Sequence, residues 1–286
     1  MSEFCDLHTH TIASDGSDSP SELIKKAKEA GLKAVAITDH DTLDGLKEGE
    51  EASKKYGVEL VPGVELSLLA PRGNMHLLGY YVNQDSKELH SVLKSVQDAR
   101  AQRNPKIVEK LNQLGLKITM DELEKMAQGG QIGRPHIARM MVEKGYVKSV
   151  SEAFDKYLKK DGPAYVPKSI LTPKEAIEAI HAANGVAVLA HPISLDPNPL
   201  TLLDEFVERW VSYGLDGIEC YYSEHTPDFT EYCIALCKRF GLIITGGSDY
   251  HGKAKPHIKL GVGKGNLQIP YSLVEGIKKR WQKLQN

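Results

Sequence analysis

Short apolar runs alternate with amphipathic segments along most of the chain. Runs rich in valine, isoleucine and leucine predict buried strands, and they are Phe4–Leu7, Lys33–Thr38, Val58–Val61, Met75–Tyr80, Val186–Ala190, Gly217–Cys220 and Leu242–Thr245. Helix-start signals separate several runs. At Ser19 and Thr172 the next residue is proline, and a glutamate follows three residues after the cap. Strands that alternate with helices predict an α/β fold with a parallel sheet, either open or closed into a barrel.

The middle of the chain breaks this alternation. Between residues 85 and 167 the apolar positions follow a helical period, and almost no strand is expected. The predicted helices are Lys87–Arg103, Pro105–Leu114, Thr119–Gln128, Arg134–Lys144 and Ser151–Lys159. Pro105 is expected to end or kink the first of them, because proline lacks a backbone N–H. We therefore predict an α/β unit from residues 1–84 and 168–286, with residues 85–167 as a helical insertion that would cap a substrate site on this unit.

Composition narrows the function only a little. Of 286 residues, 41% are hydrophobic and 26% are charged, which is ordinary for a globular protein. The net charge of −2 argues against a protein that grips long nucleic acid. No apolar stretch approaches the roughly 20 residues that cross a bilayer, and no signal peptide is expected at the N-terminus. The four cysteines are expected to be buried, inert thiols, which fits a reducing cytoplasm.

Histidines and carboxylates gather where the predicted strands end. The first run leads into a His-x-His pair, His8 and His10, and other runs lead to or contain further donors. The whole set is His8, His10, Asp15, His40, Glu65, His76, His191, Asp249 and His251. Because the carboxyl ends of parallel strands meet on one face, we expect these side chains to lie together. Taken singly, each has a simpler interpretation as a hydrogen-bonded or surface residue, and Asp15 or Asp41 as a helix N-cap.

Imidazole and carboxylate together suit manganese, zinc or iron, and nine donors exceed the needs of one ion. A carboxylate such as Glu65 can bridge two ions through its two oxygens. Paired ions can clamp a phosphate and activate water, so no serine or cysteine nucleophile is required. The sequence therefore predicts hydrolysis of a phosphate ester by a metal-bridging hydroxide, with His191 and Asp249 as candidates for proton transfer.

Six segments carry a resemblance to a known family. They are DLHTHTIASDGSDSP, AVAITDHDTLDG, VPGVEL, MHLLGY, VLAHP and GGSDYHG, in this order from residue 6 to residue 252. With them the chain resembles the polymerase-and-histidinol-phosphatase family of phosphoesterases. The resemblance implies a distorted, TIM-like barrel of seven parallel strands and seven helices. It also implies two or three divalent ions, of which manganese is the first choice.

The resemblance further implies how the candidate ligands divide among the ions. The first ion would take His8, His10, Glu65 and Asp249. The second would share the bridging Glu65 and add His76 and His191, and the third would take Asp15, His40 and His251. None of these positions is substituted, so nothing in the sequence suggests an inactive site.

Within the family, the insertion is similar to that of nucleoside-phosphate phosphatases. The similar segments are DARAQRN, GRPHIA and AYVPK, and the candidate substrate contacts in them are Arg100, Arg103, Asn104, Arg134 and His136. Arg100 and Arg103 share a helix face, and a helix that starts near Arg134 favours an anion. A guanidinium can hold phosphate through two hydrogen bonds. Solvated helix charges remain the alternative for Arg100 and Arg103, and His136 stays open between the two interpretations.

We therefore predict a metal-dependent phosphoesterase that acts on nucleoside 3′,5′-bisphosphates or 5′-monophosphates. Trimming of short RNA from its 5′ end would use the same site. Histidinol phosphatase is an alternative, as is an amidohydrolase, although amidohydrolases commonly bridge metals with a carboxylated lysine where Glu65 stands here. A non-catalytic, metal-stabilised module is the remaining alternative, and the complete ligand set weighs against it. The expected partner is a small nucleotide or short oligoribonucleotide, with no long nucleic acid and no membrane; the oligomeric state is left open.

Overall fold

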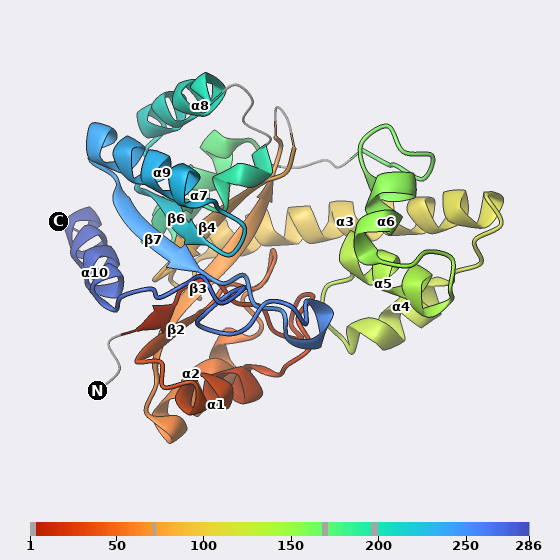
Figure 1. Ribbon diagram of the computed structural model, residues 1–286, viewed down its shortest axis with the longest axis horizontal. Coiled ribbons are helices and arrows are strands. Elements are labelled where there is room, and N and C mark those ends of the chain that lie inside the picture. Colours follow the sequence, from red (N-terminus) through yellow and green to blue (C-terminus); the bar gives the residue numbers. More distant parts are fainter. Residues whose placement is uncertain (1–3, 71–72, 168–170, 196–199, 286) are drawn as a thin grey trace.

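A sheet of seven strands, in chain order, lies at the centre of the larger part of the molecule (Figure 1). The computed structural model describes residues 4–70, 73–167, 171–195 and 200–285. The strands are β1 Cys5–Asp6, β2 Ala34–Ile37, β3 Glu59–Leu68, β4 Met75–Tyr80, β5 Val186–Leu189, β6 Gly217–Tyr222 and β7 Ile243–Gly247. The backbone N–H of Leu7, just after β1, donates to the carbonyl of Gly246 in β7 over 3.2 Å, so the first strand lies beside the last. The sheet is therefore a nearly closed barrel, and the predicted fold class is confirmed.

One strand runs against the others. β4 pairs antiparallel with β3 and with β5, whereas the other strand pairs are parallel. The expectation of seven parallel strands is wrong at this strand. Only residues 69–74 connect β3 to β4, and a parallel crossover needs a dozen residues or more. As a result His76, at the start of β4, reaches the same end of the barrel as residues that follow the other strands.

β3 is longer than the sequence predicts. The predicted strand ends at Val61, but the observed one continues through Pro62 to Leu68. It pairs with β2 as far as Pro62 and with β4 from Gly63 onward, so a new partner takes over where proline lacks a donor. Glu65 therefore projects from within a paired strand and not from a loop.

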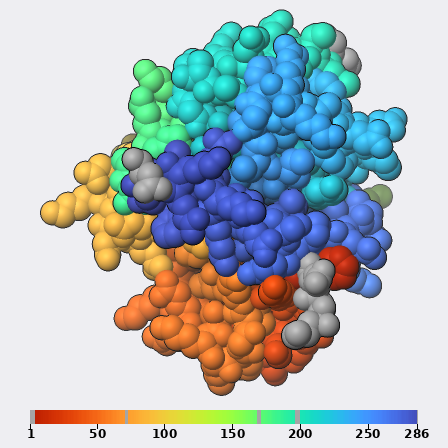
Figure 2. Space-filling model, turned by 90° about the vertical axis from the view of Figure 1, so that its left-hand side faces the viewer, coloured from red at the N-terminus to blue at the C-terminus, as the bar shows by residue number. Residues whose placement is uncertain are grey.

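Helices surround the barrel, and the capping boxes predicted at Ser19 and Thr172 are both present. The barrel helices are α1 Pro20–Glu29, α2 Leu46–Tyr56, α7 Pro173–Ala182, α8 Thr201–Ser212, α9 Pro227–Phe240 and α10 Ser272–Leu284, with short 3₁₀ turns η2 Pro192–Leu195 and η3 Gly252–Ala254. Figure 2 shows the face on which the C-terminal segment, in dark blue, lies between the orange early part of the chain and the light-blue α9. No helix in the described ranges has the length and apolar character needed to span a membrane.

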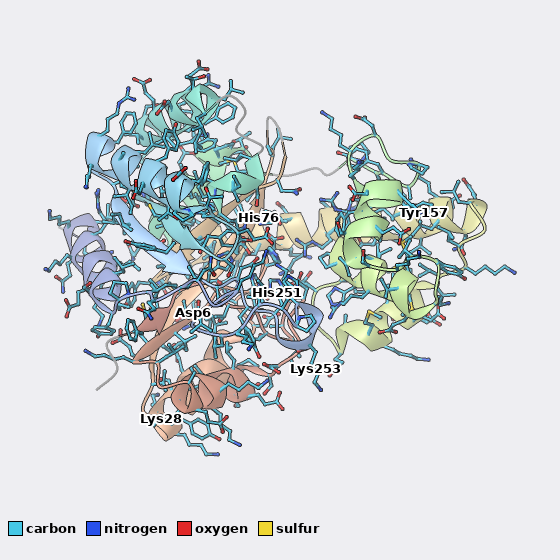
Figure 3. All side chains as sticks on the ribbon, in the orientation of Figure 1. Asp6, Lys28, His76, Tyr157, His251 and Lys253 are labelled. Carbon is cyan, nitrogen blue, oxygen red and sulfur yellow. The ribbon has the colours of Figure 1, made fainter. Side chains whose placement is uncertain are left out.

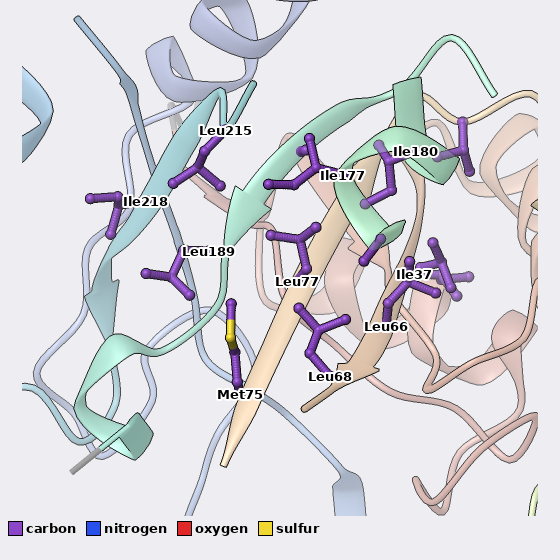
Figure 4. Close-up of a cluster of buried hydrophobic side chains, with 14 of the residues drawn as sticks. Ile37, Leu66, Leu68, Met75, Leu77, Ile177, Ile180, Leu189, Leu215 and Ile218 are labelled. Carbon is purple, nitrogen blue, oxygen red and sulfur yellow. The ribbon is translucent and has the colours of Figure 1, made fainter. Parts of the chain in front are cut away.

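Successive strand residues point into two different apolar clusters, as the two-residue period of a strand requires. Leu77 belongs to the outer cluster and Leu78 to the inner one. Figure 4 shows part of the outer cluster, in which Leu77 lies near Ile177 and Ile180 of α7. α10 contributes to the inner cluster, which fixes the strands from inside the barrel. This double packing gives the strand ends a rigid base.

The insertion contains helices α3 Lys87–Gln113, α4 Met120–Ala127, α5 Arg134–Glu143 and α6 Val150–Ala153, followed by a π-helical turn, η1 Phe154–Leu158. It lies on the opposite side of the barrel from the two chain ends (Figure 1). The expected separate helices Lys87–Arg103 and Pro105–Leu114 are one helix, so Pro105 does not end it. Leu89 packs in the outer barrel cluster and Leu111 in a separate insertion cluster, so packing on both sides keeps α3 continuous. The domain boundaries stay a prediction, and Lys168 lies outside the described residues.

Candidate metal centre

The nine candidate metal ligands meet at one end of the barrel, on the side that faces the insertion. The strands or the loops after them carry His8, His10, Asp15, His40, Glu65, His76, His191, Asp249 and His251. Figure 3 shows His76 and His251 in this central region, although they lie far apart in the sequence. Within each of four groups of three or four of these residues, the donor atoms lie within 4.8 Å of one another. The structure therefore brings together every ligand that the sequence predicts.

Glu65 lies at the centre of the cluster. Its Oε2 is 3.2 Å from Nε2 of His8 and 3.2 Å from Nε2 of His10. The same oxygen is 3.1 Å from Nδ1 of His40. Its other oxygen, Oε1, is 2.9 Å from Nε2 of His191. Both oxygens of one carboxylate thus face imidazole nitrogens on two sides, which is the placement that a bridging ligand requires.

The other candidate ligands extend the cluster in two directions. Nδ1 of His76 is 2.8 Å from Glu65 Oε1. On the opposite side, Nε2 of His251 is 3.2 Å from Oδ1 of Asp15. Oδ1 of Asp249 lies 3.4 Å from Nδ1 of the same His251. The cluster is therefore elongated, with room for donors of more than one ion.

Several of these buried atoms lack a hydrogen-bond partner. They are Nε2 of His8 and of His10, Nδ1 of His40, Oε2 of Glu65 and Oδ1 of Asp15. Buried polar atoms in folded proteins are nearly always satisfied, so five orphans that face a common centre need an explanation. Imidazole and carboxylate donors around a divalent cation supply one. The residues present therefore fit a site for metal ions.

The charges point the same way. Burial raises the pKa of Glu65, but neighbouring imidazoles, His40 foremost, outweigh it and hold that pKa well below its usual range. Burial also raises the pKa of Asp15, but His251 and His40 outweigh it and hold that pKa well below its usual range. Burial lowers the pKa of His10, but Asp249 and Glu65 raise it to about 9. Ionised carboxylates that attract positive charge this strongly favour bound cations.

Glu219 was missed in the sequence, although it contacts two candidate ligands. This buried carboxylate of β6 lies 3.0 Å from Nδ1 of His8 and accepts the backbone N–H of His191 over 2.7 Å. A carboxylate behind a histidine fixes the ring and leaves its other nitrogen free for a metal. Burial lowers the pKa of His8, but Glu219 and then Glu65 raise it well above the usual value. The only signal in the sequence is a charged residue inside an otherwise apolar strand.

Asp249 is oriented by two further residues that were missed. Its Oδ2 accepts a hydrogen bond from the hydroxyl of Tyr222 over 3.1 Å and from Nζ of Lys255 over 2.7 Å. Burial raises the pKa of Asp249, but Lys255 and His251 lower it well below the usual range. One oxygen is thus occupied by these donors while the other faces the cluster.

The backbone is also constrained beside the ligands. His191 and Asp249 have positive φ angles of 26° and 59°, a region that costs energy for residues with a side chain. Gly247 allows the chain to pass very close to β1, since a Cβ there would lie 2.1 Å from Cβ of His8. Holding these side chains in position therefore costs the folded protein some stability.

A cavity of about 210 Å³ opens beside the cluster. Glu65 and Asp249 line it on the barrel side, and Arg100, Arg103 and Arg134 line it on the insertion side. Burial, together with Arg134 and Arg100, lowers the pKa of Arg103 to about 10. Among the residues that the structure describes, neither Arg103 nor Arg134 has a carboxylate partner. Two cations thus face a cavity whose other wall is a candidate metal centre.

Arg100 differs from the other two arginines. Its guanidinium pairs with Asp41 and lies 3.3 Å from Oγ of Ser67. Gln97, one turn earlier on α3, donates to the carbonyl of Asp41 over 2.8 Å. Arg100 and Arg103 are only 8% and 5% exposed, so the alternative that they are solvated helix charges is wrong.

Asn104 and His136 do not line the cavity. Nδ2 of Asn104 donates to the carbonyl of Ile132 over 2.8 Å, and the backbone N–H of Gly133 donates to Nδ1 of His136 over 3.1 Å. Burial lowers the pKa of His136 to about 4, so this ring is neutral. Both side chains hold the loop before α5.

This loop of the insertion contacts the loop after β1 directly. Gln131 N–H donates to the carbonyl of Ala13 over 3.1 Å. A Cβ on Gly130 would lie 2.0 Å from the carbonyl oxygen of Ile12, so only glycine allows the approach. The insertion is thereby fixed over the candidate metal centre.

Comparisons with known proteins give a consistent result. A family model described as the PHP domain matches residues 6–166. The 5′-3′ exoribonuclease Rnm of Escherichia coli is 32% identical over 283 residues, which cover 98% of this chain and 94% of that protein. The 3′,5′-nucleoside bisphosphate phosphatase of Chromobacterium violaceum is 32% identical over 247 residues, 86% of either chain. A solved structure described as a metal-dependent phosphoesterase, from Bifidobacterium adolescentis, has a TM-score of 0.88 at 33% identity and covers 96% of both chains. The similarity extends over barrel and insertion alike.

Proposed function

The chain belongs to the PHP domain family and is a metal-dependent phosphoesterase, and we propose that its substrates are nucleoside 3′,5′-bisphosphates or 5′-monophosphates. One observation carries this proposal. The cavity has candidate metal ligands around Glu65 on one side and the guanidiniums of Arg103 and Arg134 on the other. A small molecule with a phosphate ester and further negative charge matches both walls.

The metal ions would be held by the cluster around Glu65. We propose His8, His10 and Asp249 with Glu65 for one ion, and His76 and His191 with Glu65 for the second. The third would take Asp15, His40 and His251. Ions bound there lower the pKa of water and neutralise charge on a phosphoryl group. We propose manganese, which these donors suit, as do zinc and iron.

The protein's own groups would orient the substrate and move protons. Arg103 and Arg134 would hold a second phosphate through charge-assisted hydrogen bonds, which are the strong ones. Lys255 and His251 hold the pKa of Asp249 well below its usual range, so this carboxylate stays ionised and does not donate a proton at neutral pH. For proton transfer we propose His191, which lines the cavity, or a water held near Asp249 or His251.

The arginines also argue against histidinol phosphate as the substrate. That molecule carries an amine and a single phosphate, and an ammonium group beside Arg103 and Arg134 would be repelled. The expected partner stays a small nucleotide or a short oligoribonucleotide. We place the reaction in the cytoplasm, where the free cysteines, all of them buried, would stay reduced.

A phosphate-release screen with manganese present tests the proposal. Nucleoside bisphosphates and monophosphates are compared with histidinol phosphate, using wild type, His8→Ala and Glu65→Ala. We expect release from the nucleotides by wild type and none by the variants. No release from any nucleotide, or unchanged release by both variants, would overturn the proposal.

A further inference from the structure

Asp41, which follows the candidate ligand His40, is bonded to β3 on both sides of Glu65. Its backbone N–H donates to the carbonyl of Glu65 over 2.9 Å, and its Oδ1 accepts the backbone N–H of Ser67 over 2.8 Å. The backbone N–H of Glu65 in turn donates to the carbonyl of Asp39 over 3.2 Å. These bonds fix the backbone of His40 against that of Glu65.

The backbone at Asp41 is held in an uncommon conformation. Its φ angle is 54°, in the left-handed region that costs energy for residues with a side chain, although aspartate enters it more often than most. Such a conformation persists only where the surrounding contacts hold it. Because His40 comes directly before this residue, the position of His40 depends on the contacts of Asp41.

Two of these contacts come from helix α3 of the insertion. Nε2 of Gln97 donates to the carbonyl of Asp41 over 2.8 Å. The guanidinium of Arg100, one turn later, pairs with Oδ2 of Asp41, and its Nη2 lies 3.3 Å from Oγ of Ser67. Both charged side chains are buried. Loss of one partner of a buried pair is strongly destabilising, because it leaves the other charge uncompensated.

Arg100 lines the cavity beside the metal centre, as Arg103 and Arg134 do, but its charge is used differently. Arg100 is paired with a buried carboxylate that is bonded to the strand of Glu65. A guanidinium neutralised in this way has less charge to offer a phosphate than the other two arginines. Its contacts instead join the insertion to the segment that carries two candidate ligands.

We propose that Arg100 is a positioning residue for the metal centre. Through Asp41 it holds His40 and Glu65 in the places from which they bind metal, and it does not bind a phosphate of the substrate. This inference rests on the proposed function, since it takes His40 and Glu65 as ligands. The insertion would thus have a part in metal binding besides its part in substrate binding.

Manganese titration of metal-depleted protein, without substrate, separates the two roles. We expect Arg100→Gln to weaken the binding of at least one manganese ion by about tenfold, as loss of a group that supports a ligand commonly does. Asn112→Ala is the control on the same helix. It removes two hydrogen bonds to the backbone of Ile118, over 2.9 and 3.1 Å, at the far end of α3. This control should bind manganese as wild type does.

Kinetics give a second readout. At limiting manganese, Arg100→Gln should lose phosphate release from a nucleoside monophosphate and from a bisphosphate by the same factor, and added manganese should restore kcat for both. An arginine that binds the second phosphate would behave otherwise. Its loss would raise KM for the bisphosphate more than for the monophosphate, added manganese would not restore the activity, and this result would overturn the inference.

Asp41→Asn tests whether Arg100 acts through Asp41. If it does, Asp41→Asn and the double variant Asp41→Asn/Arg100→Gln should weaken manganese binding as much as Arg100→Gln alone, because contacting residues with one shared effect are not additive. The double variant removes both charges of the pair, so it serves in place of Arg100→Gln if that variant fails to fold.

Unchanged manganese affinity in Arg100→Gln or in the double variant would overturn the inference and leave the proposed function intact. A loss in the double variant equal to the product of the two single losses would also overturn it, since Arg100 would then act independently of Asp41. Wild type that binds no manganese, or releases phosphate from no nucleotide, would contradict the proposed function itself.

Discussion

The metal end and the arginine end of the cavity are built differently. At the metal end, the candidate ligands come from strands or from the loops that follow them, and buried hydrogen bonds hold several of these segments in place. Asp39, for example, accepts the N–H and hydroxyl of Thr11 over 2.7 and 2.6 Å and the hydroxyl of Ser14 over 2.6 Å, which holds the loop before Asp15. At the arginine end, the one side-chain hydrogen bond that Arg103 forms with a described residue is to Oδ1 of Asn104, over 3.4 Å.

This difference separates chemistry from substrate choice. Metal ions tolerate little change in donor positions, so their ligands belong on the rigid barrel. Phosphates and bases can be held in more than one way, and the helical insertion supplies the groups for them. If this division is correct, changes at the two ends should alter different measurements.

The largest effect is expected at the bridging carboxylate. Glu65→Gln keeps the size of the side chain but removes the charge that serves both proposed ions. We expect metal content to fall and phosphate release to drop on the order of 10³-fold, because the activated water is lost. Metal analysis beside the activity assay checks this. Full metal content and near-normal phosphate release in this variant would contradict the proposed role of the metal end.

The next effect concerns a carboxylate that touches no substrate. Glu219→Gln should weaken metal binding by about 10- to 100-fold, because His8 loses the partner that orients its ring. Titration of metal into depleted protein measures this affinity. Glu224→Gln is the control, since Glu224 forms an exposed pair with Lys264. Equal affinities in the two variants would deny Glu219 a positioning role.

A smaller effect with a different signature is expected at the arginine end. Arg103→Ala should lower kcat/KM for a bisphosphate by about tenfold, since a hydrogen bond to a charged group contributes about 1.5 kcal/mol or more. Metal content should not change. Arg209→Ala, on the exposed face of α8, is the control. If Arg103→Ala lost metal instead, the two ends would not be separate.

The smallest effect is expected at Tyr222. Tyr222→Phe removes one of the two donors to Asp249 Oδ2 and leaves Lys255 in place. The loss of about 1 kcal/mol corresponds to roughly a fivefold fall in kcat. A pH profile of kcat measured alongside should keep its shape, since Asp249 would remain ionised. A fall as large as that in Glu65→Gln would show that Tyr222 acts on the substrate directly.

The sequence was most informative where histidines and carboxylates recur at strand ends. The meeting of all nine candidate ligands follows from that pattern, because parallel strands present their ends on one face, whereas the closed barrel was implied only by the family resemblance. The direction of β4 was not within reach, because the predicted strand before it ends at Val61 and leaves about a dozen residues before Met75, enough for a parallel crossover. The role of the nine residues as metal ligands stays a prediction, and so do the roles of the arginines in binding substrate.

Other features depend on tertiary contacts that no local pattern contains. Glu219 comes from a buried strand and meets His8 across 211 positions of sequence. Tyr222 of β6 reaches Asp249 across 27 positions of sequence. Pro105 carries a strong local signal for a break, and packing of α3 on two cores overrides it.

The most direct test of the account is a manganese titration of metal-depleted protein, with bound metal and phosphate release followed together. We predict that release from a nucleoside bisphosphate is absent without metal and appears only as the sites fill, with two or three ions bound per chain. Full release from metal-depleted protein, or fewer than one ion bound at saturation, would contradict the account.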